Sequence, residues 1–121
     1  MSDNFLKLAR KEIKEELDSL SQILFLCHSD SDIPTNGKEI ERHLHKIKGL
    51  APMMGQEDVG EIAALTDTIA KHLIANGTLD GSYNIILESI QTMSDIFSDA
   101  NKNAEEFKNK IRQTFPNVLK R

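Results

Sequence analysis

The sequence predicts an all-α fold: an antiparallel four-helix bundle in up-down-up-down order, followed by a short fifth C-terminal helix. Three observations predict it. Apolar residues recur at steps of three and four through most of the 121 residues, which is the period of helices with one buried face. Polar stretches rich in turn formers separate these segments, and no apolar–polar alternation long enough for a strand interrupts them. Amphipathic helices with short connections pack naturally as an antiparallel bundle.

The first helix is predicted from its N-terminal residues to the polar stretch 28–37. Its apolar stripe steps by four and three, and Phe5 and Leu8 extend a similar stripe toward the N-terminus. A helix with this pattern turns one face to the core. The members of the main stripe are Ile13, Leu17, Leu20, Leu24 and Cys27.

The second helix is predicted to start at Asn36, which forms a capping box with Glu39. Pro52 and Gly55 mark its end, and the proline predicts a bend or an early end between 48 and 52, because proline removes a backbone hydrogen bond. We expect Met53 and Met54 to fill the core. The apolar stripe comprises Ile40, Leu44, Ile47, Ala51 and Met54.

Three further helices follow. The third runs from about Val59 and closes at the glycine exit of residues 76–77. The fourth opens at residues 80–82 and carries an apolar face as far as Ala100. The last begins at a second capping box, Asn103 with Glu106, and Pro116 ends it before a basic tail.

Composition excludes several classes of protein. Fifteen Lys+Arg against nineteen Asp+Glu give a net charge of −4, so the chain lacks the broad basic surface that binds nucleic acid. The single cysteine, Cys27, excludes an internal disulfide and a cysteine-rich zinc site. No apolar run approaches the ~20 residues that span a bilayer. We therefore expect one soluble, cytoplasmic, monomeric domain over 1–121, with a core at roughly 4–113.

Four histidines are the first candidates for chemistry: His28, His43, His45 and His72. On a wheel of 100° per residue, His43 lies about 60° and His45 about 140° from the centre of the second helix's apolar stripe. His43 is therefore expected at the core boundary and His45 in solvent. The same solvent-facing sector holds Glu41, Lys48, Gly49 and Pro52.

Gly49 and Lys48 lie near His45 on this exposed face. A glycine inside an exposed helix costs about 1 kcal/mol relative to alanine, but its bare backbone lets a macromolecule approach the imidazole. Lys48 places a cation within reach of the ring. The combination favours a ring that accepts an anionic group from a docking partner. The structural alternatives are an ordinary surface histidine, a glycine needed for a close helix crossing, and a lysine that serves solubility.

The segment 45–55 resembles the signature of histidine-containing phosphotransfer (HPt) domains. His45, Lys48 and Gly49 match its His-x-x-Lys-Gly pattern, and Gly55 matches the glycine that follows six positions later. The third-helix segment 65–69, the turn at 76–77 and the fourth helix are similar to the N-terminal phosphoacceptor domain of chemotaxis-type histidine kinases. The resemblance covers roughly residues 4 to 113. Leu50 and Pro52 depart from the small residues that are common after Lys-Gly.

The resemblance implies a role for each matched residue. His45 would carry the phosphoryl group on its outer ring nitrogen, and Lys48 would offset the charge of the phosphoryl oxygens. Gly49 would give the partner room, and Gly55 would serve the turn. Asp67, on the third helix, would face the inner ring nitrogen and fix the tautomer; alternatively it pairs with Lys71 one turn on.

The implied function is that of a phosphocarrier rather than an enzyme. A histidine kinase catalytic domain would phosphorylate His45, and a response-regulator receiver domain would take the group onto its aspartate. The Mg²⁺ for these steps would belong to the partners, so no cofactor or metal is expected here. The chain would be either a free-standing relay protein or the N-terminal domain of a chemotaxis-type kinase. The alternatives are an adaptor bundle that binds partners without chemistry and, less favoured, a metal-binding bundle.

Overall fold

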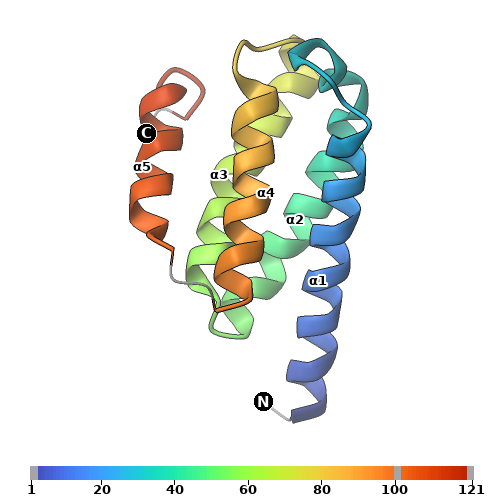
Figure 1. The fold of residues 1–121 in the computed structure, drawn as a ribbon, viewed down its shortest axis with the longest axis vertical. Coiled ribbons are helices and arrows are strands. Elements are labelled where there is room, and N and C mark those ends of the chain that lie inside the picture. The colour runs from blue at the N-terminus through green and yellow to red at the C-terminus, as the bar shows by residue number, and fades with distance from the viewer. Residues whose placement is uncertain (1–2, 100–101, 120–121) are drawn as a thin grey trace.

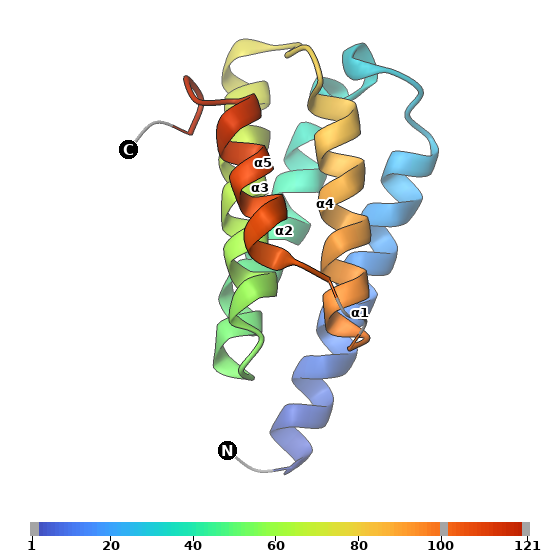
Figure 2. The same cartoon turned by 60° about the vertical axis from the view of Figure 1, so that its left-hand side comes forward.

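A computed structural model describes residues 3–99 and 102–119. It contains five α-helices and, within the described residues, no strand, which confirms the predicted fold class. The first four helices run alternately up and down, and α5 lies on the outside against α3 and α4 (Figures 1 and 2). The helices are α1 (Asp3–Phe25), α2 (Gly37–Met53), α3 (Glu57–Asn76), α4 (Ser82–Phe97) and α5 (Ala104–Thr114).

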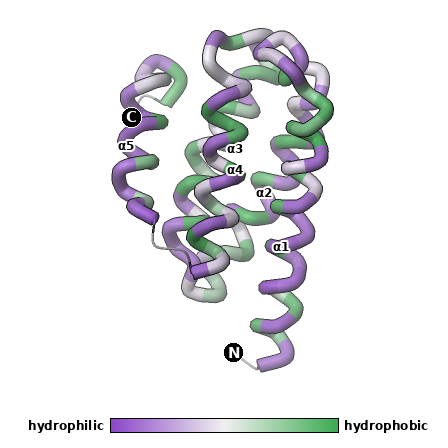
Figure 3. Tube along the Cα trace, viewed as in Figure 1, coloured by the Kyte–Doolittle hydropathy of each residue, from purple (hydrophilic) through white to green (hydrophobic). Residues whose placement is uncertain are grey.

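The apolar stripes meet in one core. Every member of the predicted α1 stripe is at most 4 % exposed, as is every member of the α2 stripe except Met54, which is partly buried. The extension toward the N-terminus is wrong for Leu8, which is 67 % exposed. The first turns of α1 project beyond the other helices (Figure 1) and carry both hydrophilic and hydrophobic residues (Figure 3). Ala9 and Ile13 are buried, so Leu8 lies on a face of α1 that is turned away from the core.

The connection between α1 and α2 differs from the predicted capping box. Asn36 is the N-cap residue of α2, but its side chain makes no capping hydrogen bond. Its amide donates instead to the Asp32 carbonyl at 2.9 Å and to Cys27 Sγ at 3.6 Å, which folds residues 30–36 into two 3₁₀ turns. The amide is therefore used inside the loop.

Asp30 in this loop fixes the start of α4. Its carboxylate accepts the backbone N–H groups of Gly81 and Tyr83 at 2.9 and 2.8 Å. These N–H groups lie at the N-terminus of α4, where donors lack intrahelical partners and where a negative charge is stabilising. An aspartate distant in sequence thus caps the helix that was predicted to open at residues 80–82.

The end of α2 rules out one of the two outcomes expected at Pro52, an early end, and leaves the bend a prediction. The helix does not stop early: it continues to Met53 with Pro52 inside it. Only the last turn loses a hydrogen bond. Gly55 has φ +82°, Gln56 N–H bonds to the Ala51 carbonyl and Gly55 N–H to the Pro52 carbonyl, a Schellman motif that ends the helix.

The other ends follow the sequence more closely. Gly77 closes α3 with φ 90°, and the Asn103 side chain accepts the Glu106 N–H at 3.0 Å, as the predicted α5 cap requires. Met53 is 51 % exposed rather than core filler, because it lies on the last turn of α2. Ala100 and the basic tail residues Lys120 and Arg121 lie outside the described residues.

No helix among the described residues combines the length and the continuous apolar character that crossing a bilayer requires.

Candidate functional site

His45 lies on the exposed face of α2, with 64 % of its side chain accessible. Its neighbours in sequence, Leu44 and Ile47, are completely buried, so the same helix that fills the core presents the imidazole to solvent. The 3.6-residue period of α2 is the cause, as predicted. A ring this accessible can be reached by another macromolecule.

His43 has a different environment. It is only 8 % exposed, and its Nδ1 hydrogen-bonds the carboxylate of Glu16 on α1. Glu16 also lies 3.5 Å from Lys46 Nζ. His43 therefore links α1 to α2 and is a buried, satisfied histidine at the core boundary.

The carboxylate nearest to His45 belongs to Glu41, one turn earlier on α2. Glu41 Oε2 lies 3.8 Å from His45 Nδ1, the inner ring nitrogen. Burial raises the pKa of the Glu41 carboxyl, and Asp67 raises it further through a hydrogen bond and through its charge, while Lys71 and His45 act to lower it. Glu41 is therefore influenced both by the imidazole and by a second carboxylate.

Asp67 is 1 % exposed and lies on α3. Its Oδ2 pairs with Lys71 at 3.3 Å, the alternative raised from sequence, and lies 3.9 Å from Lys48 Nζ. Its Oδ1 is buried and has no hydrogen-bond partner among the described residues. One ligand atom each of Glu41, His45 and Asp67 lie within 4.8 Å of one another, so α2 and α3 bring the predicted histidine, lysine and aspartate together. The orientation role of Asp67 stays a prediction.

Gly49 has open space around it. A Cβ built on this residue meets no heavy atom within 4 Å. The alternative of a close helix crossing thus has no support at Gly49. A different glycine has that role: a Cβ on Gly60 of α3 would lie 2.8 Å from Pro52 Cγ, so the close approach of α3 to the end of α2 depends on Gly60.

The sequence of residues 4–99 matches the family model described as the Hpt domain. The chain belongs to the Hpt domain family. Hpt domains are phosphocarriers that act through a histidine in phosphorelays, with histidine kinases and response regulators as partners. Neither the curated proteins nor the solved structures with which the chain was compared gave a match.

A second acidic cluster in this Hpt domain joins α3 to α5. Lys108, only 1 % exposed, donates to Asp58 and Glu105 at 2.8 and 2.9 Å and also to Glu61. Burial acts to lower the pKa of Lys108, but the three hydrogen bonds raise it overall. The ammonium group occupies the place that a cation would take among these carboxylates, so the cluster fastens α5 to the bundle.

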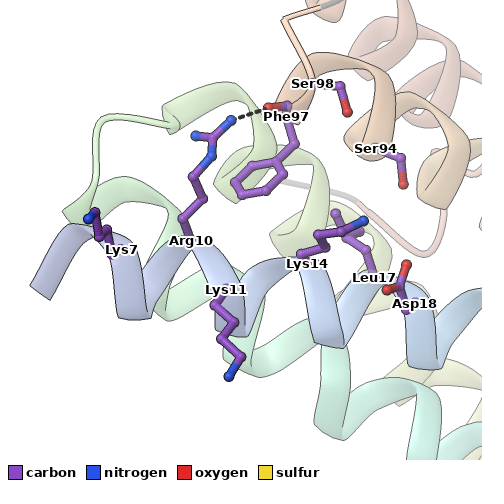
Figure 4. Close-up of a pocket in the computed structure, with 9 residues that line it drawn as sticks. All are labelled: Lys7, Arg10, Lys11, Lys14, Leu17, Asp18, Ser94, Phe97 and Ser98. Atoms are coloured by element: carbon purple, nitrogen blue, oxygen red, sulfur yellow. Dashed lines mark hydrogen bonds between the residues drawn. The ribbon is translucent and has the colours of Figure 1, made fainter. Parts of the chain in front are cut away.

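A groove of about 530 Å³ lies between α1 and α4 (Figure 4). Arg10 crosses it: the guanidinium donates to the Phe97 carbonyl at 3.1 Å and lies 4.6 Å from the centre of the Phe97 ring. Arg10 thereby satisfies a carbonyl at the C-terminal end of α4. None of the lining residues belongs to the His45 cluster, so this groove is separate from the Hpt site.

Sequence reasoning did not assign roles to Glu41, Lys108 or Asp30. Glu41 offered a signal, because it shares the His45 sector of the helical wheel and precedes His45 by one turn. Lys108 and Asp30 offered none: their partners lie 47 to 53 residues away in sequence, apart from Glu105.

Proposed function

We propose that this Hpt domain accepts a phosphoryl group on Nε2 of His45 from a histidine kinase and passes it to the aspartate of a receiver domain. The observation that carries the proposal is the motif histidine itself, 64 % exposed on α2, with open space at Gly49 one turn on. A neutral imidazole is nucleophilic near pH 7. The domain would be phosphoryl acceptor and donor, and the ATP and Mg²⁺ chemistry would belong to its partners.

Lys48 supports the phosphorylated state. Its Nζ lies on the His45 side of α2, 3.9 Å from Asp67, and its side chain is 43 % exposed. A cation at that position can turn toward the phosphoryl oxygens and offset their charge. Asp67 would hold Lys48 near the site between transfer events.

Partners would dock on the α2–α3 face. Gly49 leaves the backbone of α2 uncovered beside the ring, and a shallow hollow follows it, lined by Lys48, Pro52, Glu57, Gly60, Glu61 and Ala64. Leu50, partly buried, borders the same surface. An accessible backbone and a few apolar groups suit a receiver that must close over the histidine.

Two contexts fit the proposal. The domain acts either as a free-standing cytoplasmic relay, a single monomeric unit over 1–121, or as the N-terminal phosphoacceptor domain of a chemotaxis-type kinase. The second candidate function, an adaptor without phosphotransfer, would need no exposed histidine, and the open space at Gly49 disfavours it.

The test is the intact mass of the protein after incubation with phosphoramidate, beside His45→Gln. We expect one acid-labile phosphoryl group on the wild-type protein and none on the variant, with equal helicity and melting temperature because the side chain is exposed. If the donor gives no modification, a panel of histidine kinases with ATP follows. Failure with both kinds of donor would contradict the proposal and favour the adaptor, whereas unfolding of His45→Gln would contradict the placement of His45 in solvent.

A further inference from the structure

We propose that Glu41 is the positioning residue for His45: its carboxylate accepts the inner-nitrogen proton and so directs the lone pair of the outer nitrogen to phosphorus. This inference rests on the proposed function and deepens it. It gives Glu41 on α2 the orienting role that the resemblance implied for Asp67 on α3. Asp67 then acts on Glu41 rather than on His45 directly.

The distances indicate that Glu41, rather than Asp67, is the carboxylate that pairs with His45. Glu41 Oε2 is 3.8 Å from His45 Nδ1, whereas the ion pairs that the described residues form with Asp67 are those of Lys71 and Lys48, at 3.3 and 3.9 Å. Glu41 is 23 % exposed and His45 is 64 % exposed, so the carboxylate lies deeper than the ring and on its inner side. The separation is short enough for a small side-chain rotation to complete a hydrogen bond.

Asp67 influences the protonation state of Glu41. It is buried, its Oδ1 has no hydrogen-bond partner within the part of the chain that the structure describes, and its presence helps to raise the pKa of Glu41. When Glu41 carries a proton, it can donate to Asp67; when it is ionised, it is free to accept from His45. The raised pKa of Glu41 agrees with the first of these states. The groups that face Glu41 are His45 on its own helix, and Asp67 and Lys71 on α3.

The chemistry balances with phosphoramidate as donor. The Nε2 lone pair of His45 forms the new N–P bond while the donor's P–N bond breaks, and the leaving amine takes a proton from solvent. The ring becomes positively charged because it keeps the proton on Nδ1. An ionised Glu41 beside that proton stabilises the charge, as an orienting carboxylate does for other nucleophilic or basic histidines.

A bound divalent cation is the competing interpretation of Glu41, His45 and Asp67, since their ligand atoms lie within 4.8 Å of one another. Two lysines near Asp67 make a bound cation unfavourable. Lys71 and Lys48 already hold Asp67 Oδ2, and a third positive charge at the same carboxylate would be repelled. The cluster is therefore better explained as a chain of hydrogen bonds and ion pairs.

The experiment compares Glu41→Met with Glu39→Met. Glu39 is a matched control, because it lies on the same helix and its Oε1 is likewise 3.8 Å from a ring nitrogen of a histidine four residues on, His43. Two quantities are measured: the rate of His45 phosphorylation by phosphoramidate, and the ¹⁵N shifts of the His45 ring in the unphosphorylated protein. A third variant, Glu41→Gln, keeps an oxygen that can accept the proton.

We expect Glu41→Met to slow phosphorylation about tenfold, the lower end of the loss seen when a histidine's orienting partner is removed, and to move the ring proton away from Nδ1. Glu39→Met should change neither, and Glu41→Gln should keep the tautomer and recover part of the rate. A wild-type rate and tautomer in Glu41→Met would overturn the inference. If neither phosphoramidate nor the histidine kinases with ATP phosphorylate the wild-type protein at His45, the proposed function fails. The ring shifts still decide whether Glu41 holds the proton.

Discussion

The two acidic clusters of the molecule use the same residue types in opposite ways. Around Lys108, three carboxylates share one buried ammonium group, and each is joined to it by a hydrogen bond. Beside His45, two carboxylates face each other, and the lysines that help to neutralise them, Lys48 and Lys71, are 43 and 56 % exposed. In the first cluster the ammonium group has a carboxylate partner for each of its three N–H donors. In the second, Asp67 Oδ1 is buried and has no hydrogen-bond partner among the described residues.

The difference separates stability from function. A buried ammonium group with all of its hydrogen bonds made fixes one arrangement of the helices that carry its partners. An incompletely satisfied network costs stability, but its protons and cations can move when a charged group arrives. We therefore expect variants of the Lys108 cluster to change the free energy of unfolding and leave phosphorylation intact, and variants of the His45 cluster to do the reverse.

The largest stability effect is expected for Lys108→Met. Methionine keeps most of the buried stem but removes three charge-assisted hydrogen bonds. We expect a loss of about 3 kcal/mol, the lower end of the range for a broken buried ion pair, because the carboxylates left behind keep access to water. Urea unfolding followed by circular dichroism measures the loss. Wild-type stability of the variant would contradict the stabilising role of the Lys108 cluster. A lower rate of His45 phosphorylation at a temperature where the variant is folded would contradict its separation from the His45 site.

Gly60→Ala is expected to cost about 2 kcal/mol. The new Cβ would lie 2.8 and 2.9 Å from two ring carbons of Pro52, and a rigid proline ring cannot rotate away as a flexible side chain does. The same urea titration tests this expectation. Because Pro52 lies in the last turn of the helix that carries His45, we also expect slower transfer to a receiver. A fully stable variant would show that α2 and α3 can separate slightly.

Gly49→Ala should have the opposite effect on stability. Its Cβ meets nothing within 4 Å, so the variant gains about 1 kcal/mol from the better helix propensity of alanine. Larger side chains should obstruct the partner: Gly49→Gln should slow transfer from phosphorylated His45 to a receiver while phosphorylation by the small donor phosphoramidate continues. Equal transfer rates for Gly49→Gln and the wild-type protein would refute the role of Gly49 in partner approach.

The contrast between the two glycines shows what a sequence pattern can predict. The helical period placed His45 outside and Leu44 inside, and the match to His-x-x-Lys-Gly selected His45 from four histidines. Within α2 a wheel is sufficient, because every relation lies within one or two turns. It could not say which glycine meets another helix, since Gly60 is defined by Pro52 on α2.

The same limit explains the other differences. Asn36 has the right spacing for a capping box, yet its amide bonds within the loop, and the α4 N-terminus is capped by Asp30 from 51 residues away. Leu8 is apolar, yet it is 67 % exposed, because the buried face of α1 runs through Ala9 and Ile13 instead. The sequence therefore predicted the fold, the exposed position of His45 and the pairing of Asp67 with Lys71. It did not predict that Glu41 lies beside Asp67 and Lys71, because these residues reach Glu41 only when α3 packs on α2.

The smallest expected effect is the pH dependence of stability caused by Glu41. Its pKa is raised in the folded protein, so the folded state binds the proton more tightly than the unfolded chain. The contribution of Glu41 to stability therefore falls as the pH rises through its folded pKa. In Glu41→Gln this loss is absent, so the stability of the variant relative to the wild-type protein should increase between about pH 4, near the ordinary glutamate pKa, and about pH 7. The increase should be less than about 1 kcal/mol because the side chain is partly exposed. Urea titrations of both proteins across this interval measure the difference, and Glu39→Gln is the control. A difference that is constant with pH, or that decreases, would mean that Glu41 is already ionised without cost and that Asp67 does not share its proton.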